Sequence, residues 1–191
     1  MRRHFVYILG ILLILSVSHC AKRGTPTGGA KDSLPPVLIR ATPPLNTTLF
    51  DEEKITLLFD EYIKLKDITN QLITSPPLEP SQYKISPEST VSKKVEIRLL
   101  DSLKSDVTYT FNFGSSIEDF NENNPLTFFS YTFSTGVIID SLYLEGIVKD
   151  AFEKETEPFV SVHLYPIDST YTDSAIFKRK PFYIANTLDS V

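Results

Sequence analysis

One stretch decides how the chain folds: Lys54-Ile-Thr-Leu-Leu-Phe-Asp-Glu-Tyr-Ile-Lys-Leu65. From Ile55 to Phe59, apolar residues occupy every second position, and a mixed set of residues lies between them. A period of two is typical of a β-strand that buries one face, because successive side chains point to opposite sides. After Asp60 the alternation loosens, so we expect Tyr62 and the residues after it to form a connection.

Later segments share this alternation and predict a set of neighbouring strands. Phenylalanine (13) and tyrosine (9) are abundant, tryptophan is absent, and 13 prolines favour turns. Aromatic and β-branched runs divided by turn residues predict an all-β fold, an antiparallel sandwich. We expect Phe59, Phe111 and Phe133 to lie in one core, because each has the apolar parity of its strand. The expected strands are residues 37–41, 55–59, 71–74, 83–85, 95–99, 109–113 and 129–133.

Composition limits the function classes. The chain has 191 residues, 41% of them hydrophobic and 23% charged, which is typical of a globular protein. Its net charge of −5 argues against a nucleic-acid surface, which needs a basic stripe. The clusters Lys93-Lys94 and Lys178-Arg179-Lys180 are interpreted as solvated loop charges.

The first twenty residues predict export. Arg2 and Arg3 precede thirteen almost wholly apolar residues, 5–17, which is the pattern of a secretory signal peptide. As a helix this run would span about 20 Å, less than the roughly 30 Å of a bilayer core, so a spanning helix is the less favoured interpretation. Cys20 is the only cysteine, so the sequence offers no internal disulfide and no cysteine zinc site.

The apolar run ends in Ser16-Val-Ser-His-Cys20, which resembles the lipobox of bacterial lipoproteins. In that motif the peptide is cut before a cysteine, which then receives lipid. The resemblance implies a signal peptide over 1–19, lipidation at Cys20 and a flexible tether over 20–34, a segment rich in Gly, Pro and Thr. An uncleaved anchor or an ordinary signal peptide is the alternative.

Six motifs occur in an order that resembles a known family. The resemblance covers residues 32–136 and is to the bacterial Ig-like domain of S-layer type, found in lipoproteins of Bacteroidota. It implies a seven-stranded Ig-like sandwich over 35–136, a cell-envelope setting and no agreed catalytic residue. The motifs are Asp32-Ser-Leu-Pro-Pro36, Ile55-Thr-Leu-Leu-Phe-Asp-Glu-Tyr-Ile63, Ile73-Thr-Ser-Pro-Pro-Leu78, Leu103-Lys-Ser-Asp-Val-Thr-Tyr-Thr-Phe-Asn-Phe-Gly114, Asn124-Pro-Leu126 and Tyr131-Thr-Phe-Ser-Thr-Gly136.

The remaining segment, residues 138–191, predicts part of a second β module. Residues 142–150 and 160–165 alternate as strands do, and 181–185 could add a third. The first two resemble the opening of a transthyretin-like or carboxypeptidase-regulatory sandwich. Such a module continues through several more strands, so we expect either a fragment of it or a degenerate form.

Clustered carboxylates are the first candidates for a catalytic site. Asp60 and Glu61 are adjacent, and Glu118, Asp119 and Glu122 cluster near a loop. A glycosidase would need two such groups held across a cleft, about 5–9.5 Å apart. Because the sequence indicates no cleft, we interpret these residues as solvated turn charges.

The loop 119–124 gives a candidate cation site through Asp119, Asn121 and Asn123. Oxygen-bearing residues stand at the first, third and fifth positions, as in a calcium loop. The pattern fails as an EF-hand, because Asn124 replaces the usual glycine and Ser130 the final glutamate. The alternative is a polar hairpin loop in which asparagines adopt left-handed conformations.

These observations favour a protein that is not an enzyme. His163 is expected on an exposed strand, and the sequence has no Gly-x-Ser-x-Gly elbow that would give this histidine a nucleophile. No cofactor is expected. The lack of tryptophan argues against a carbohydrate-stacking platform, although a carbohydrate-binding accessory module or an envelope hydrolase component is the alternative function.

We therefore expect a lipid-anchored envelope protein whose Ig-like module is a spacer, adhesion or binding unit. Its expected partner is the membrane, reached through the lipid anchor, with an envelope protein or glycan as a further partner and no nucleic acid. Lys22 and Arg23 follow Cys20 with no acidic residue before Asp32. By resemblance to lipoproteins of this group, that pattern favours the periplasmic face of the outer membrane over the cell surface.

Overall fold

The structure of the protein is a computed structural model that describes residues 29–156, 160–169 and 171–187. The predicted signal peptide, Cys20 and the first part of the predicted tether lie outside the described residues. Contacts divide the chain into two units, Met1–Lys31 and Asp32–Val191, and the fold described here is that of the second. Within the described ranges, no helix has both the length and the apolar character needed to cross a membrane.

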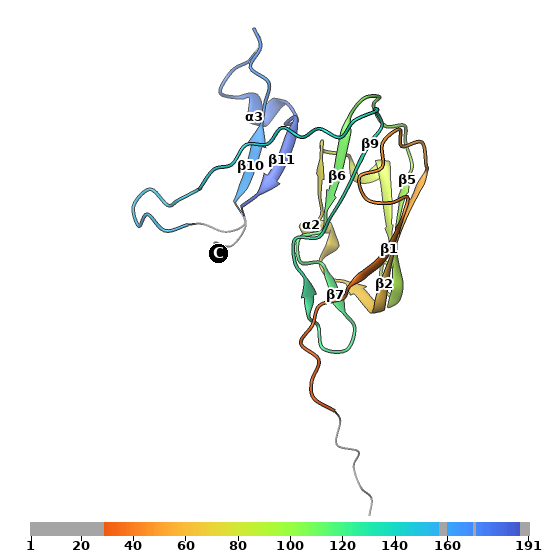
Figure 1. The fold of residues 1–191 in the computed structure, drawn as a ribbon. Helices are drawn as coiled ribbons and strands as arrows, with labels where there is room; N and C mark the ends of the chain where they lie inside the picture. Colours follow the sequence, from red (N-terminus) through yellow and green to blue (C-terminus); the bar gives the residue numbers. More distant parts are fainter. Residues whose placement is uncertain (1–28, 157–159, 170, 188–191) are drawn as a thin grey trace, which may run out of the picture. The chain divides into compact units, whose positions relative to one another are not determined.

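Two antiparallel sheets form the Ig-like β-sandwich (Figure 1). The larger sheet has the order β4-β5-β2-β7-β8, and β1 pairs with β2 on the side away from β5. The smaller sheet has the order β3-β6-β9. A short helix and a 3₁₀ turn, α2 (Ile68–Gln71) and η1 (Pro80–Gln82), lie in the connections before β3 and β4. The strands are β1 (Leu38–Thr42), β2 (Lys54–Leu65), β3 (Ile73–Ser75), β4 (Tyr83–Ser86), β5 (Ser92–Leu99), β6 (Thr108–Asn112), β7 (Ile117–Asp119), β8 (Pro125–Leu126) and β9 (Ser130–Ser134).

The long strand β2 is the centre of the larger sheet. Its first half lies between β1 and β5, and its second half pairs with β7. The prediction of a connection after Asp60 is therefore wrong. Strand β2 continues to Leu65, and its second half pairs with β7 where its first half paired with β1. Ile63 keeps the inward parity of Ile55 and is fully buried, so the apolar pattern persists although Glu61 interrupts it.

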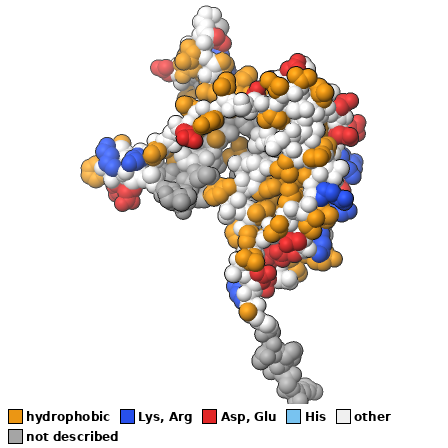
Figure 2. All heavy atoms as spheres, in the orientation of Figure 1, with side chains coloured by type: hydrophobic (Ala, Val, Ile, Leu, Met, Phe, Trp, Pro, Cys, Tyr) orange, Lys and Arg blue, Asp and Glu red, His pale blue; other side chains and the backbone are white. Residues whose placement is uncertain are grey.

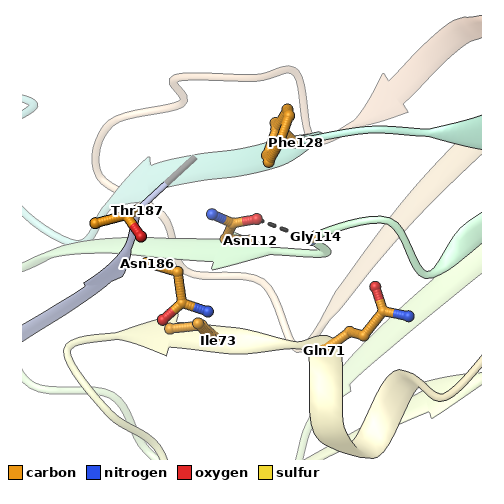
Figure 3. Close-up of a pocket in the computed structure, with 7 residues that line it drawn as sticks. All are labelled: Gln71, Ile73, Asn112, Gly114, Phe128, Asn186 and Thr187. Atoms are coloured by element: carbon orange, nitrogen blue, oxygen red, sulfur yellow. Dashed lines mark hydrogen bonds between the residues drawn. The ribbon is translucent and has the colours of Figure 1, made fainter. Parts of the chain in front are cut away.

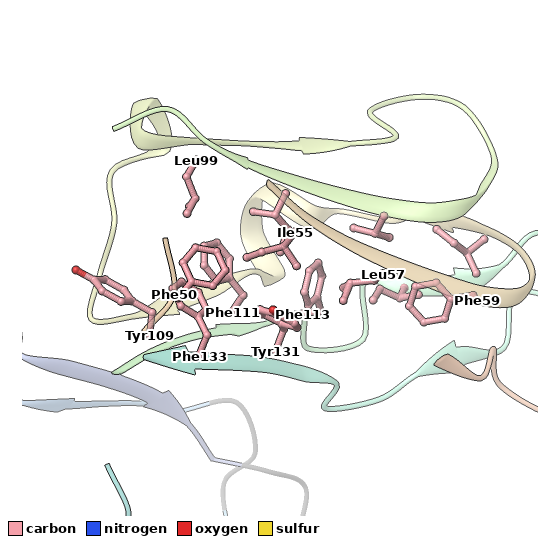
Figure 4. Packing of buried hydrophobic residues seen from close by; sticks show 14 residues of the cluster. Phe50, Ile55, Leu57, Phe59, Leu99, Tyr109, Phe111, Phe113, Tyr131 and Phe133 are labelled. Atoms are coloured by element: carbon pink, nitrogen blue, oxygen red, sulfur yellow. The ribbon is translucent and has the colours of Figure 1, made fainter. Parts of the chain in front are cut away.

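The core lies between the inward faces of the two sheets (Figure 4). β2 and β5 contribute mainly aliphatic side chains, and β6 and β9 contribute aromatic ones. The prediction that Phe59, Phe111 and Phe133 share one core is confirmed, since all three are fully buried in the same cluster. The rings of Phe111 and Phe133 stack at 6.4 Å, and Tyr109 stacks on Phe133 at 5.6 Å. The rest of the buried cluster is Phe50, Ile55, Leu57, Ile63, Val95, Ile97, Leu99, Phe113, Ile117 and Tyr131.

Tyr131 connects the core to the chain between β1 and β2. Its hydroxyl donates to the carbonyl oxygen of Pro43 at 2.9 Å, and its ring is fully buried. Burial raises the pKa of Tyr131 to about 12, so the hydroxyl stays protonated and remains a donor at neutral pH.

Three sequence predictions differ from the structure. Gln71 ends a helix and strand β3 begins at Ile73, so the expected strand over 71–74 starts two residues too early. The short strands β7 and β8 were not expected, and they raise the sandwich from seven strands to nine. The expected strand over 142–150 is absent: Lys149 makes only an isolated bridge to Thr156. Within the described residues, this segment has no neighbouring strand along which to pair.

The last described segment forms a two-stranded antiparallel pair, β10 (Ser161–Leu164) with β11 (Tyr183–Asn186). The short helix α3 (Ala175–Lys178) lies between them in sequence. β11 contacts the edge strand β3, where the Ile184 amide donates to the Ser75 hydroxyl at 3.2 Å. The side chains of β10 are exposed, so no second sheet among the described residues covers this pair.

We predict that Phe111→Ala lowers the free energy of unfolding by about 3–5 kcal/mol, because it leaves a cavity among stacked rings. The matched control is Phe152→Ala, since Phe152 is 92% exposed and should contribute little. Denaturant titration of both variants measures the difference. A loss below about 1 kcal/mol for Phe111→Ala would contradict the packing described here.

We also predict that a chain ending at Gly136 keeps the sandwich. Every buried residue of the core cluster lies between Phe50 and Phe133, so the later residues contribute none of it. Its melting temperature should stay close to that of the full chain, and protease should cut the full chain first beyond about residue 138. An unfolded truncated chain, or a later segment as resistant as the sandwich, would show that the segment belongs to the same core.

Candidate functional site

The structure gathers carboxylates at one end of the sandwich. Partial burial raises the pKa of Glu61, and the negative charges of Asp119, Asp60, Asp32 and Glu122 raise it further, in that order. These groups are therefore close enough to repel one another. Sequence adjacency does not make Asp60 and Glu61 a catalytic pair, because consecutive strand residues point to opposite faces.

Asp119 holds the loop between β7 and β8 in place. Its carboxylate accepts the backbone N–H groups of Glu122 at 2.6 Å, Asn123 at 3.1 Å and Asn124 at 2.7 Å. Burial raises the pKa of Asp119, but the N–H donors together outweigh burial and lower it. The carboxylate thus functions as a cap for its own loop.

The candidate cation ligands lie in this loop, but donors of the protein already bind oxygens of Asp119 and Asn123. Asn123 adopts the left-handed region, with φ 67°, and its side-chain oxygen accepts a hydrogen bond from the Lys64 ammonium. Asn121 also directs its backbone N–H toward Asp119. A calcium ion needs several free oxygens, and an ammonium group beside them opposes a second cation. Among the described residues, no group of three or more His, Cys, Asp or Glu side chains is placed to hold a metal.

Glu118 points away from Asp119 and lies between two lysines. Its side chain is 6% exposed, with Lys66 Nζ at 2.8 Å from Oε1 and Lys64 Nζ at 3.7 Å from Oε2. The hydrogen bond and the charge of Glu118 raise the pKa of Lys66. Two cations beside one buried carboxylate offset part of the cost of burying its charge. The arrangement supports the β2–β7 pairing and does not resemble an acid–base pair.

One small cavity lies beside the smaller sheet (Figure 3). Its volume is about 30 Å³, enough for about two water molecules. Ligand pockets usually measure about 300–1,000 Å³, so this cavity does not fit a small-molecule substrate. Its lining residues are Gln71, Ile73, Asn112, Gly114, Phe128, Asn186 and Thr187.

His163 lies on exposed strand β10, as its sequence position predicts. Its ring is 6.3 Å from that of Tyr165. Of the exposed aromatic residues in the sandwich, Tyr62 lies under the ammonium of Lys93, 5.5 Å from the ring centre. That ring is therefore partly covered by a cation.

The outward face of the larger sheet carries a basic patch that sequence reasoning missed. Five exposed cations come from four strands, and Figure 2 shows Lys and Arg side chains, with Asp and Glu side chains near them, along the side where β1, β2 and β5 lie in Figure 1. The interpretation of Lys93-Lys94 as loop charges is wrong, since both residues belong to β5. Alternation within β5 could have placed Lys94 and Arg98 on one face. The basic face, as we call it, consists of Arg40, Lys54, Lys84, Lys94 and Arg98.

The two antiparallel sheets packed around one core define the class of the domain as an Ig-like β-sandwich. Residues 32–135 match the bacterial Ig-like domain, and the chain belongs to that family. No curated protein matches the chain. Among solved structures, a selenomethionine form of PcoC, a copper resistance protein from Escherichia coli, is similar with 19% identity and a TM-score of 0.35, covering 55% of this chain and all of that one. A second structure, of the methionine-rich copper resistance protein PcoC from the same organism, shows 21% identity and a TM-score of 0.34, covering 51% of this chain and 95% of that one.

We predict that Asp119→Asn lowers the free energy of unfolding by about 1–3 kcal/mol at pH 7, because it weakens charge-assisted hydrogen bonds to three backbone N–H groups. Glu122→Gln is the control, since it removes a charge from the same loop while the Asp119 cap stays. Denaturant melts of both variants give the comparison, and an equal loss in both would show that charge alone is responsible.

The pH dependence follows from the same cap. The folded-state pKa of Asp119 is depressed, so its stabilisation is present above the unfolded pKa of about 3.9 and is lost as pH falls through the folded value. The stability difference between the parent protein and Asp119→Asn should therefore shrink as pH falls below about 4. A difference that stays constant down to the acid transition would contradict the role of the ionised carboxylate.

Proposed function

We propose that the protein is a lipid-anchored component of the bacterial cell envelope, in which the Ig-like domain serves as a non-catalytic structural, spacer or binding unit. One observation carries this proposal: an apolar run ends at the lone Cys20, and a folded Ig-like domain begins at Asp32. That order suits a domain held by a short tether at a membrane surface.

The arrangement of the charged residues supports a non-catalytic role. Asp119 caps its own loop, and Glu118 is bound by Lys64 and Lys66. Each carboxylate therefore has a structural task, Asp119 in its own loop and Glu118 beside the β2–β7 pairing. The described cavity is also too small for a substrate.

Lipid chemistry supports stable attachment through Cys20. One acyl chain gives only marginal membrane binding, whereas two or more signals anchor a protein stably. A lipoprotein cysteine carries three chains in the proteins whose lipobox this sequence resembles. Lys22 and Arg23, with no acidic residue before Asp32, favour retention at the periplasmic face of the outer membrane.

Metabolic labelling with an alkyne fatty acid tests the anchor. The parent protein should take up the label and stay in the membrane fraction after a high-salt wash, and Cys20→Ala should take up none. Ser18→Ala is the control, because it alters the same segment and keeps the cysteine. An unlabelled parent protein, or a Cys20→Ala variant that labels equally, would exclude lipidation at this residue.

A further inference from the structure

The basic face has a regular arrangement set by the strand register. Lys54 on β2 is directly opposite Arg98 on β5, and Arg98 is directly opposite Lys84 on β4. Neighbouring strands lie about 4.8 Å apart, so these three cations form one straight row across three strands. Four residues further along these strands, Lys94 on β5 and Arg40 on β1 flank Leu58 of β2.

In the described part of the chain, two carboxylates form ion pairs with cations of this face. Glu96 lies 3.6 Å from Lys54, and Glu88 lies 2.8 Å from Lys84. The other three cations, Arg40, Lys94 and Arg98, form no ion pair with a carboxylate in the described part of the chain. The face thus carries a local excess of positive charge on a chain whose net charge is −5.

This row opposes the stability of the sheet. Like charges directly opposite on neighbouring strands are destabilising, and Arg98 has a cation opposite it on both sides. An anionic surface laid across the row would remove that repulsion. The cations stand on a pleated sheet with a spacing of about 5 Å, which suits many phosphate groups in a plane better than one enclosed ligand.

The larger sheet begins with the strand that follows the predicted tether in the sequence. β1 is the first strand after the tether and is the edge strand beside the first half of β2. Asp32 lies twelve positions after Cys20, a span of at most about 43 Å. Val37 and Ile39, at the same edge, are 58% and 61% exposed and could enter the headgroup layer beside the cations.

We propose that the basic face lies against the anionic phospholipid headgroups of the membrane that holds Cys20. The lipid anchor belongs to the proposed function, whereas attraction of this face to phosphate headgroups needs no anchor. The acidic residues 51–53 precede Lys54 and weaken the potential at that end of the row. More distant acidic groups contribute little, because salt screens charges beyond about 10 Å at 0.1 M.

Vesicle co-sedimentation tests the proposal with the chain from Ala21 to Val191, which keeps every described residue and lacks the lipid site. The protein should bind phosphatidylcholine vesicles that contain about 30 mol% phosphatidylglycerol and should not bind pure phosphatidylcholine. Binding should disappear at 1 M salt, where the screening length is about 3 Å. Removing three cations in Lys54→Gln/Lys84→Gln/Arg98→Gln should weaken binding about 100-fold.

The matched control removes three charges elsewhere, in Lys104→Gln/Lys149→Gln/Lys178→Gln, and should bind as the parent protein does. Equal binding to neutral vesicles, or equal losses in the two triple variants, would overturn the proposal. The proposal would also be overturned if the protein failed to bind anionic vesicles but bound soluble polyphosphate. That result would assign the basic face to an anionic polymer. Fatty-acid labelling of Cys20 is a separate measurement, so failure of the anchor and failure of the basic face are distinguishable.

Discussion

Packing of the aromatic face of β6 and β9 on the aliphatic face of β2 and β5 is the interaction on which the rest of the structure depends. Ile55, Leu57, Phe111 and Phe133 are all fully buried in this layer. A strand alternates its side chains, so burying one face also decides which residues face solvent. A slip of one residue in β5 would bury Lys94 and Arg98 and expose Val95. The core thereby sets the register that aligns the basic face.

Two polar side chains near the core, Ser116 and Thr74, lie where hydrogen bonds satisfy them. The Ser116 hydroxyl donates to the Phe113 carbonyl oxygen at 2.7 Å, and Thr74 Oγ1 accepts the Leu78 amide at 2.8 Å. Unpaired buried polar groups are costly, so each of these bonds is needed for its connection to approach the core. Asp119, itself fully buried, has the same task in the β7–β8 connection, where its carboxylate orders a whole loop. The position of Asp119, a candidate for catalysis or cation binding, is thus explained by its hydrogen bonds to backbone N–H groups.

Alternation made the main strands predictable. Phe59, Phe111 and Phe133 each lie on the apolar face of an alternating strand, so they could be assigned to one core before the strand pairing was known. β7 and β8 were missed because strands of three and two residues are too short for a period to show. The segment 142–150 has the alternating pattern of a strand but, among the described residues, no neighbouring strand to pair with. A strand forms only where another backbone shares its hydrogen bonds.

The functional surfaces were harder to predict, because they depend on pairing between distant segments. Lys54, Lys84 and Arg98 are far apart in sequence, and only the β2–β5 and β4–β5 registers bring them into one row. The net charge of −5 also hid this local excess. The cation interpretation of residues 119–123 rested on residue types alone, which do not reveal that backbone N–H groups bind the Asp119 carboxylate and that Lys64 binds the Asn123 side-chain oxygen.

Native-state hydrogen exchange of the backbone amides tests most directly whether the aromatic–aliphatic layer is the stabilising unit. Amides of β2, β5, β6 and β9 should exchange together at the slowest rate, since they open only when this layer separates. Amides of β10 and β11 should exchange much faster, because their side chains add nothing to the core cluster. Equal protection of β11 and β6 would contradict the account, as would fast exchange in β6 while β2 stays protected.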